Sequence, residues 1–233
     1  MPGPVDGSIW YTVGVFGGAA GFLRFDPATG LSEVFDVPKP AFGICGGDID
    51  KNGVLWASLS SGHLGSFDRR KCKGPLNGPT ATGAHCPEGW TFHKYPGPAF
   101  EGFEEMSAEG SYYTWVDQHN SFGLGENVSM STANLNDGLI ALKDGLIALK
   151  DGLVALKDGL VALKDGKMVM LRVPYPMGFY AKGFDGRIDD PAAGWKGRGI
   201  WTANGDRTPW LMEGGSASPR AVRFQIRPDP LAR

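Results

Sequence analysis

Hydrophobic side chains in this chain recur in short alternating runs of about five residues, separated by turn-forming residues. The segment GFLRFDPATGLSEVFDVP, residues 21–38, has one such run on either side of a DPATG turn. Similar runs occur in HLGSFDRRKC and GWTFHKYPGP, and later in KMVMLRVPYP and AVRFQIRPDP. Together with 36 glycines and 17 prolines in 233 residues, the pattern predicts many short strands joined by turns, and therefore an all-β fold.

One heptapeptide occurs four times in tandem, as DGLIALK, DGLIALK, DGLVALK and DGLVALK, and fills residues 137–164. Asp-Gly is the dipeptide that best fits a two-residue hairpin turn, so each copy predicts one strand of a β-meander. In that register Lys143 pairs with Leu146 and Leu142 pairs with Ile147. One face of the meander is then entirely aliphatic and needs a partner layer, so we expect the repeat strands to be a place of self-association.

The same repeat allows two other structures. Seven residues is also the coiled-coil period, with Leu139 and Leu142 at the a and d positions. Each copy, however, contains a glycine that costs about 1 kcal/mol relative to alanine inside a helix, and the meander is favoured for that reason. The third alternative is a slippage expansion that forms no regular layer.

A longer and weaker repeat is marked by tryptophan. DGSIWYTV, NGVLWASL and GRGIWTAN share a turn glycine and an aliphatic residue directly before a Trp. Trp10 and Trp56 are 46 residues apart, and Trp201 follows after 145 more, close to three further steps of that length. A period of about 40–50 residues with four short strands per unit is typical of a β-propeller.

We therefore expect a single propeller-like domain of about four blades that need not form a complete ring. The blades are expected at about 1–45, 46–100, 101–180 and 181–233, with the DG-turn meander of residues 137–164 inserted in the third.

The alternation of [DN]G-x-[IVL]-W strands with RFDPATG turns resembles the NHL-type β-propellers of the streptogramin B (virginiamycin B) lyase-like group. Three longer segments carry the same resemblance: GDIDKNGVLWASLSSGHLGSFDRRKCKGPLNGPTATG, SYYTWVDQ and MLRVPYPMGFYAKGFDGRIDDPAAGWKGRGIW. The resemblance covers nearly all of the chain outside the heptapeptide repeat, and it implies that about three copies are an insertion. It further implies that the chain corresponds to the C-terminal part of a longer relative, which is periplasmic or secreted.

Charge and hydropathy argue against nucleic acid as a partner and against a membrane span. The net charge is −2 and the pI is near 6.1, so the chain lacks the basic footprint of a nucleic-acid-binding protein. No apolar run approaches the roughly 20 residues needed to span a bilayer. The segment MPGPVDGSIW lacks the charged and apolar regions of a signal peptide, so we expect no signal peptide in this chain.

Two of the three cysteines, Cys72 and Cys86, bracket a loop rich in Gly, Pro and Thr that has few packing residues of its own. A disulfide there would restrict the unfolded chain by about 3 kcal/mol, and secreted proteins commonly close such loops in this way. The alternatives are two unrelated thiols, or zinc with His85, although no second ligand pair completes four ligands.

Two groups of residues are candidates for catalysis or metal binding. His63, in SLSSGHLGSFD, is expected at a junction between strands that faces the central channel, where it could act as a general base or a metal ligand. Asp48, Asp50 and Asn52 match the first half of a calcium loop, although position 12 of that loop is Leu59. Mg²⁺ or Ca²⁺ are the cofactors that these residues suggest, and an ordinary turn is the alternative.

The segment SYYTWVDQHN is the densest cluster of aromatic and polar residues in the chain. Strand alternation places Tyr113, Trp115 and Asp117 on one face, where they could hold a small-molecule or carbohydrate-like ligand. Asp117 and His119 are also weak catalytic candidates beside His63. The alternative is that these aromatic residues form the core of a blade, with one edge of the cluster exposed to solvent.

From these observations we expect a propeller-type ligand-binding or lyase-like protein with its site at the central channel. The resemblance implies that any enzyme of this kind would be a carbon–oxygen lyase using a histidine, an acid and Mg²⁺, although no catalytic position of the family can be matched residue by residue here. The alternatives are a non-catalytic interaction module or an inactive fragment of a longer propeller.

Overall fold

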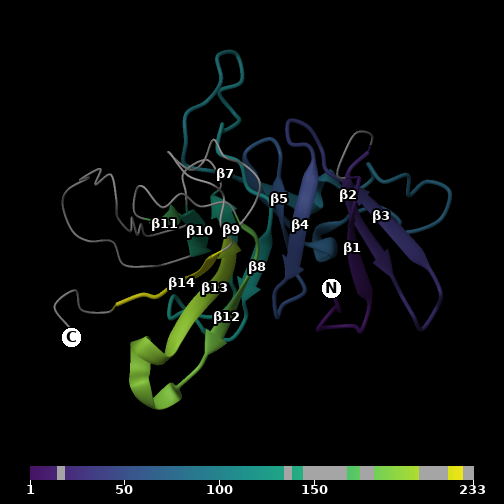
Figure 1. Cartoon of the computed structure of the whole chain (residues 1–233). Helices are drawn as coiled ribbons and strands as arrows, with labels where there is room; N and C mark the ends of the chain where they lie inside the picture. Colours follow the sequence, from purple (N-terminus) through teal and green to yellow (C-terminus); the bar gives the residue numbers. More distant parts are fainter. Residues whose placement is uncertain (15–18, 134–137, 144–166, 174–180, 205–219, 228–233) are drawn as a thin grey trace. The chain divides into compact units, whose positions relative to one another are not determined.

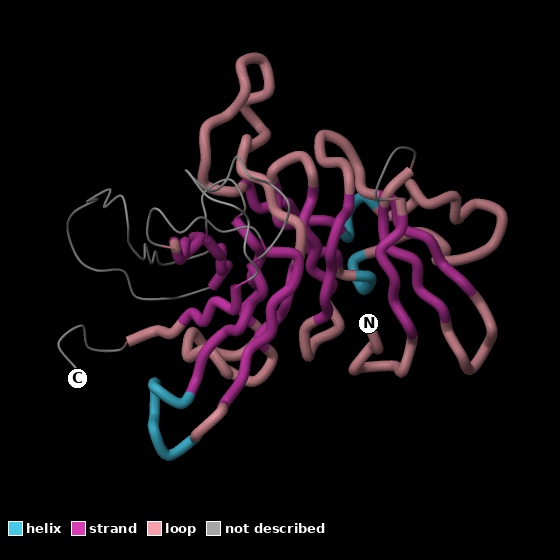
Figure 2. Tube along the Cα trace, in the orientation of Figure 1, coloured by secondary structure: helices cyan, strands magenta, loops and turns pink. Residues whose placement is uncertain are grey.

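The structure is a computed structural model that describes residues 1–14, 19–133, 138–143, 167–173, 181–204 and 220–227. In these residues the chain is all-β and folds into four antiparallel sheets of three or four strands each (Figure 1 and Figure 2). Each sheet is a simple meander in which consecutive strands are neighbours. This is the organisation of propeller blades, so the predicted fold class, all-β and propeller-like, is confirmed.

The chain divides into two compact units, residues 1–116 and 117–233. The first unit holds two sheets. The first sheet contains β1 (Ile9–Val13), β2 (Gly21–Phe25) and β3 (Ser32–Asp36). The second contains β4 (Ile44–Ile49), β5 (Leu55–Leu59), β6 (His63–Phe67) and β7 (Trp90–Lys94), with two short 3-10 helices between β6 and β7, η1 (Arg69–Lys71) and η2 (Pro87–Gly89).

Aromatic side chains from both sheets form one core in the first unit. Phe22 stacks on Trp90 with 5.4 Å between ring centroids, and Phe35 lies 4.7 Å from Phe67. Trp10 packs against the same rings and is 3% exposed. Rings of this size bury much of the apolar area of a small unit, so they account for most of the packing between these two sheets.

The connection between β6 and β7 covers the edge of β3. A disulfide between Cys72 and Cys86 closes this connection, as the spacing predicted, with 5.1 Å between the Cα atoms. Beyond Cys72 the loop reaches β3, where the N–H of Asp36 donates to the carbonyl of Gly83 at 2.9 Å. Gly83 has a φ of +95°, and a Cβ there would collide with the Asp36 carboxylate, so only glycine fits. The disulfide-closed loop thus shields a sheet edge that would otherwise be open.

The second unit contains the remaining two sheets, and the boundary between the units falls inside β8. One sheet has β8 (Thr114–Asp117), β9 (Val128–Ala133), β10 (Gly138–Lys143) and β11 (Lys167–Arg172). The other has β12 (Ala181–Ile188), β13 (Arg198–Asn204) and β14 (Arg220–Phe224), with the 3-10 segment η3 (Pro191–Gly197) between β12 and β13. The predicted single domain and its blade ranges stay predictions.

The first copy of the heptapeptide is a strand, but its partners differ from those predicted. β10 pairs with β9 on one side and with β11 on the other, so that Lys143 faces Lys167 and Leu142 faces Met168. The predicted pairing of Lys143 with Leu146 is therefore wrong, because β11, which follows the repeat, takes the place expected for the second copy. The other three copies lie outside the described residues.

The loop between β6 and β7 generates a first prediction. Replacing Cys72 and Cys86 together by serine should lower the free energy of unfolding by about 2–4 kcal/mol, because the unfolded chain regains the freedom of the loop. Urea unfolding followed by tryptophan fluorescence measures this change. Cys45→Ser is the control, since Cys45 makes no disulfide. Equal stability of the double variant and the control would contradict the role given to the loop.

Candidate binding site

A row of three side chains crosses the first sheet and places a charge pair inside it. In the strand register Trp10 faces Arg24, and Arg24 faces Glu33. Arg24 and Phe22 are two positions apart and both are buried, because they lie on the same face of β2. Arg24 is 6% exposed and Glu33 is 3% exposed. Charges so far from water require partners, and the sheet supplies them directly across the strands.

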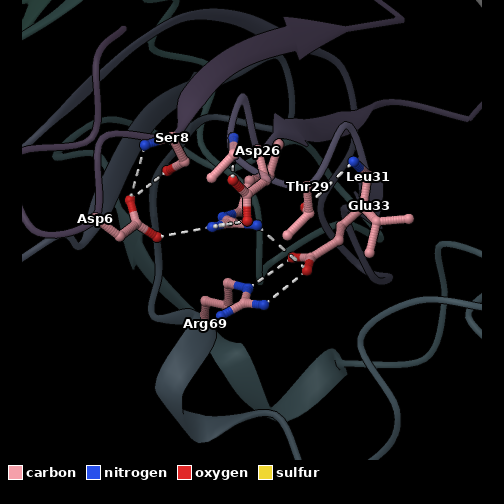
Figure 3. Close-up of polar contacts among 9 residues, drawn as sticks. Asp6, Ser8, Asp26, Thr29, Leu31, Glu33 and Arg69 are labelled. Carbon is pink, nitrogen blue, oxygen red and sulfur yellow. Dashed lines mark hydrogen bonds and ion pairs between the residues drawn. The ribbon is translucent and has the colours of Figure 1, made fainter.

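Glu33 accepts bonds from two guanidinium groups, one from β2 of the first sheet and one from η1. Arg24 Nη1 donates to Glu33 Oε1 at 3.4 Å. Arg69, in η1, forms the closer and bidentate pair, with Nε at 2.6 Å from Oε2 and Nη2 at 2.7 Å from Oε1 (Figure 3). The forked geometry matches the carboxylate, and the buried glutamate therefore fixes η1 against β3.

Two aspartates complete the cluster around Arg24. Nη2 of Arg24 lies 2.9 Å from Oδ2 of Asp6 and 3.6 Å from Oδ2 of Asp26. Partial burial acts to raise the pKa of Asp6, but bonds from the hydroxyl and N–H of Ser8 and from Arg24 outweigh it and lower the pKa to about 2. The N–H of Ala28 likewise lowers the pKa of Asp26. Both carboxylates are therefore ionised near neutral pH.

A hollow of about 170 Å³ lies beside this cluster, between the N-terminal turn, the β4–β5 turn and η1. Three of its charged wall residues are Asp6, Asp68 and Arg70, and Asn52 adds an amide. The complete lining is Gly3, Pro4, Val5, Asp6, Trp10, Ile49, Asn52, Gly53, Asp68, Arg69 and Arg70.

The side chains at the mouth of the hollow are held by local bonds. Asp68 Oδ1 accepts from the N–H of Arg70 at 3.1 Å and so caps η1. The Arg70 guanidinium returns to the same carboxylate, with Nε at 2.8 Å from Oδ1 and Nη2 at 3.0 Å from Oδ2. This pair lowers the pKa of Asp68, and the Arg70 side chain remains 66% exposed. We call these wall residues, with their hollow, the Asp6–Arg70 pocket.

The predicted metal ligands perform structural tasks around a turn. Asp50 Oδ1 accepts from the N–H groups of Asn52 and Val54, at 2.8 and 2.9 Å, and closes the β4–β5 turn. Asp48 Oδ2 accepts from the N–H of Val116 at 2.8 Å. Within the described residues there is no group of three or more His, Cys, Asp and Glu side chains placed to hold a metal ion. Asn52 alone of the predicted three lines the Asp6–Arg70 pocket.

His63 is the first residue of β6, directly after the turn that joins β5 to β6. It is 5% exposed, its Nδ1 lies 3.0 Å from the Ser61 hydroxyl, and its ring packs on Phe92. Burial lowers the pKa of His63, although a hydrogen bond to the Glu105 backbone acts in the opposite direction. The side chain is thus held neutral inside the first unit.

The residues predicted to share an aromatic face have different environments. Asp117 is fully buried at the end of β8, and its carboxylate accepts from the N–H groups of His119, Ser121 and Phe122. His119 is exposed in the following loop. Tyr113 precedes the strand, is 39% exposed and contacts the ring of Tyr112, while Trp115 is half-buried. The Asp117 carboxylate therefore organises a loop and is not presented beside Tyr113.

Comparison with known proteins adds information about the fold. No protein-family model and no curated protein matches the sequence. A solved structure of a catalytically inactive virginiamycin B lyase from Staphylococcus aureus with quinupristin aligns with 97% of this chain and 54% of its own, at 12% identity and a TM-score of 0.47. A selenomethionine-substituted virginiamycin B lyase from the same organism aligns at 11% identity and a TM-score of 0.38, over 99% and 59% of the two chains. The chain thus spans little more than half of these structures, and such values assign no activity to it.

The buried charge cluster generates a second prediction. Glu33→Gln leaves the guanidinium groups of Arg24 and Arg69 without their shared carboxylate and should cost about 3–5 kcal/mol of unfolding free energy. Asp26→Asn is the matched control, since its carboxylate is farther from Arg24 and closer to solvent, and it should change the urea midpoint little. A small effect of Glu33→Gln would show that Glu33 does not hold η1 on β3.

His63 generates a third prediction, about pH. The fold favours the neutral imidazole, so the unfolded chain binds a proton more tightly, and the free energy of unfolding should fall as the pH drops below about 6.5. In His63→Gln that part of the pH dependence should disappear. Urea midpoints at about pH 7.5 and about pH 5.5 measure the difference, and an unchanged pH dependence in the variant would refute it.

Proposed function

We propose that this chain is a propeller-type binding module that holds a small polar ligand in the Asp6–Arg70 pocket. The observation that carries the proposal is a hollow of about 170 Å³ whose polar walls are fixed before any ligand arrives. Asp6 is bound by Ser8 and Arg24, and Arg69 by the buried Glu33. Groups held in this way need little reordering when a ligand binds, which favours affinity.

The chemistry of the walls suits a ligand with several hydroxyl groups. Asp68, Asn52 and Arg70 carry planar groups that can each make two hydrogen bonds, and Trp10 and Ile49 add apolar surface. The volume is close to that of cavities of about 150 Å³ that hold one six-membered ring. A single sugar ring, or a small molecule that resembles one, fits both requirements. The carbohydrate-like ligand expected from the Tyr113 segment is thereby proposed for a different site.

Binding is favoured over catalysis by the state of the candidate catalytic groups. His63 is buried and hydrogen-bonded to the Ser61 hydroxyl. The Asp117 carboxylate accepts hydrogen bonds from backbone N–H groups of the following loop. A general base has to reach the proton that it removes, and neither group is exposed to do so. His119, the third candidate, is exposed, but the nearby Asp117 carboxylate is bonded to backbone N–H groups and is not available as its acid partner. A lyase-like activity has no comparable support from the described residues.

We further propose that the protein acts in an oxidising compartment, such as the periplasm or the extracellular space. The support is the Cys72–Cys86 disulfide, since such bonds are rare in reducing compartments. No helix in the described part of the chain is long and apolar enough to cross a membrane.

The proposed function generates a fourth prediction. In ligand-observed NMR and calorimetry with glucose, galactose, mannose and N-acetylglucosamine, at least one sugar should bind the wild-type chain. Arg70→Ala and Asn52→Ala should each weaken that binding about tenfold, because each removes hydrogen bonds at the pocket mouth. Both residues are exposed, so neither change should lower the thermal unfolding midpoint appreciably.

Lys39→Ala is the control, since Lys39 is an exposed cation of the first unit that does not line the pocket. It should leave sugar binding unchanged. The proposal fails if none of the four sugars binds, or if the Arg70 and Asn52 variants bind as tightly as the control does.

A further inference from the structure

The sheet of β12, β13 and β14 has one buried face and one exposed face. Ile200, Thr202 and Phe224 are at most 9% exposed and lie on the buried face. On the opposite face Trp201 is 37% exposed, and it lies in a cross-strand row between Asp185 of β12 and Arg223 of β14. The Trp201 ring is therefore available to a ligand on the solvated face of the sheet.

Arg223 is held flat against the sheet beside this ring. Its guanidinium lies 5.2 Å from the centre of the Trp201 ring, and Nη2 is 3.0 Å from Asp189 Oδ2 and 3.1 Å from the carbonyl of Lys196. The Trp201 Nε1 donates to the same Asp189 carboxylate at 3.3 Å. Gly199 makes room for this arrangement, because a Cβ there would lie 2.8 Å from Arg223 Nε.

A second indole lies at the end of the same sheet, in η3. The Lys196 ammonium is 5.8 Å and the Arg227 guanidinium 5.2 Å from the centre of the Trp195 ring. Gln225 anchors this segment, since its Nε2 donates to the carbonyls of Lys196 and Arg198 at 2.7 and 3.0 Å. Both indoles are therefore held in place by bonds within the sheet and η3.

The charges around the indoles favour an anionic ligand. Of the nearby acids, Asp185 is exposed beside Trp201 across the strands, Asp189 is paired with Arg223, and Asp190 caps η3 by accepting from the N–H of Ala192. The cations Arg187, Lys196, Arg223 and Arg227 outnumber these three acids. Arg187 and Lys196 are exposed, and neither forms a salt bridge within the described residues. Fixed rings beside cations that lack a carboxylate partner suit a ring-shaped molecule that carries its own carboxylate.

We propose that the exposed face formed by Arg187, Trp195, Lys196, Trp201 and Arg223 binds an acidic polysaccharide, with a uronate ring on Trp201 and its carboxylate near Arg187. We call this face the Trp201 platform. Its residues extend along one sheet face from Arg187 to Trp195, so it suits a chain of sugars more than a single ring. It lies in the second unit and does not depend on the Asp6–Arg70 pocket of the first.

The platform is tested with three probes on the whole chain: oligogalacturonate, a neutral dextran oligomer of the same length, and single-stranded DNA. Oligogalacturonate should bind best, and its affinity should fall as salt is added, because the contacts are partly ionic and exposed. Trp201→Ala should weaken this binding about tenfold or more, Trp201→Phe less, and Arg187→Gln about threefold.

Several results would overturn the platform. One is equal or tighter binding of dextran, which would remove the role of the carboxylate; another is tighter binding of DNA, which would assign the face to nucleic acid. A third is unchanged binding of oligogalacturonate in Trp201→Ala. Lys39→Ala removes an exposed cation of the first unit that belongs to neither proposed site, so it is the control and should bind oligogalacturonate normally. Thermal unfolding of each variant shows whether it is folded, and Trp201→Phe keeps the ring if the alanine variant is not.

Discussion

The first unit depends on one buried carboxylate. Glu33 comes from β3, the edge strand of the first sheet. It accepts bonds from Arg24 of β2 and from Arg69 of η1. A carboxylate so far from water is tolerable only while both cations stay close, because removal of either leaves an uncompensated charge. The position of η1, the path of the disulfide-closed loop and one wall of the Asp6–Arg70 pocket all follow from this contact. Packing of aromatic rings holds the two sheets of the first unit together, and the Arg69–Glu33 ion pair fixes η1 against β3.

The sequence was informative where a local rule determines the structure. The Cys72–Cys86 disulfide follows from two cysteines around a loop with little packing of its own, and the all-β class follows from short alternating runs. The Arg24–Glu33 pair was missed, because counting outward from the DPATG turn, residues 26–30, places Arg24 opposite Ser32. In the structure Leu31 is one more loop residue, so Phe25 pairs with Ser32 and Arg24 with Glu33.

Other features could not be obtained from local pattern. The burial of His63 is one of them, because the residues that cover its ring, such as Phe92, are distant in the sequence. Asp117, the acid in the aromatic segment, was expected to face a ligand. In the structure its carboxylate oxygens accept hydrogen bonds from backbone N–H groups of the next loop. The Trp201 platform needs Asp189, Gly199 and Arg223 from three places in the chain, and only the strand register brings them together.

The pairing of β10 has a consequence for how the heptapeptide repeat can vary. Both edges of the first copy are already paired, with β9 and β11, so the sheet is complete with one copy. The first two copies are identical in sequence, which makes them equivalent candidates for that single position. Gain or loss of whole heptapeptides would therefore lengthen or shorten the connection between β10 and β11 and leave a strand of the same sequence to pair with β9 and β11.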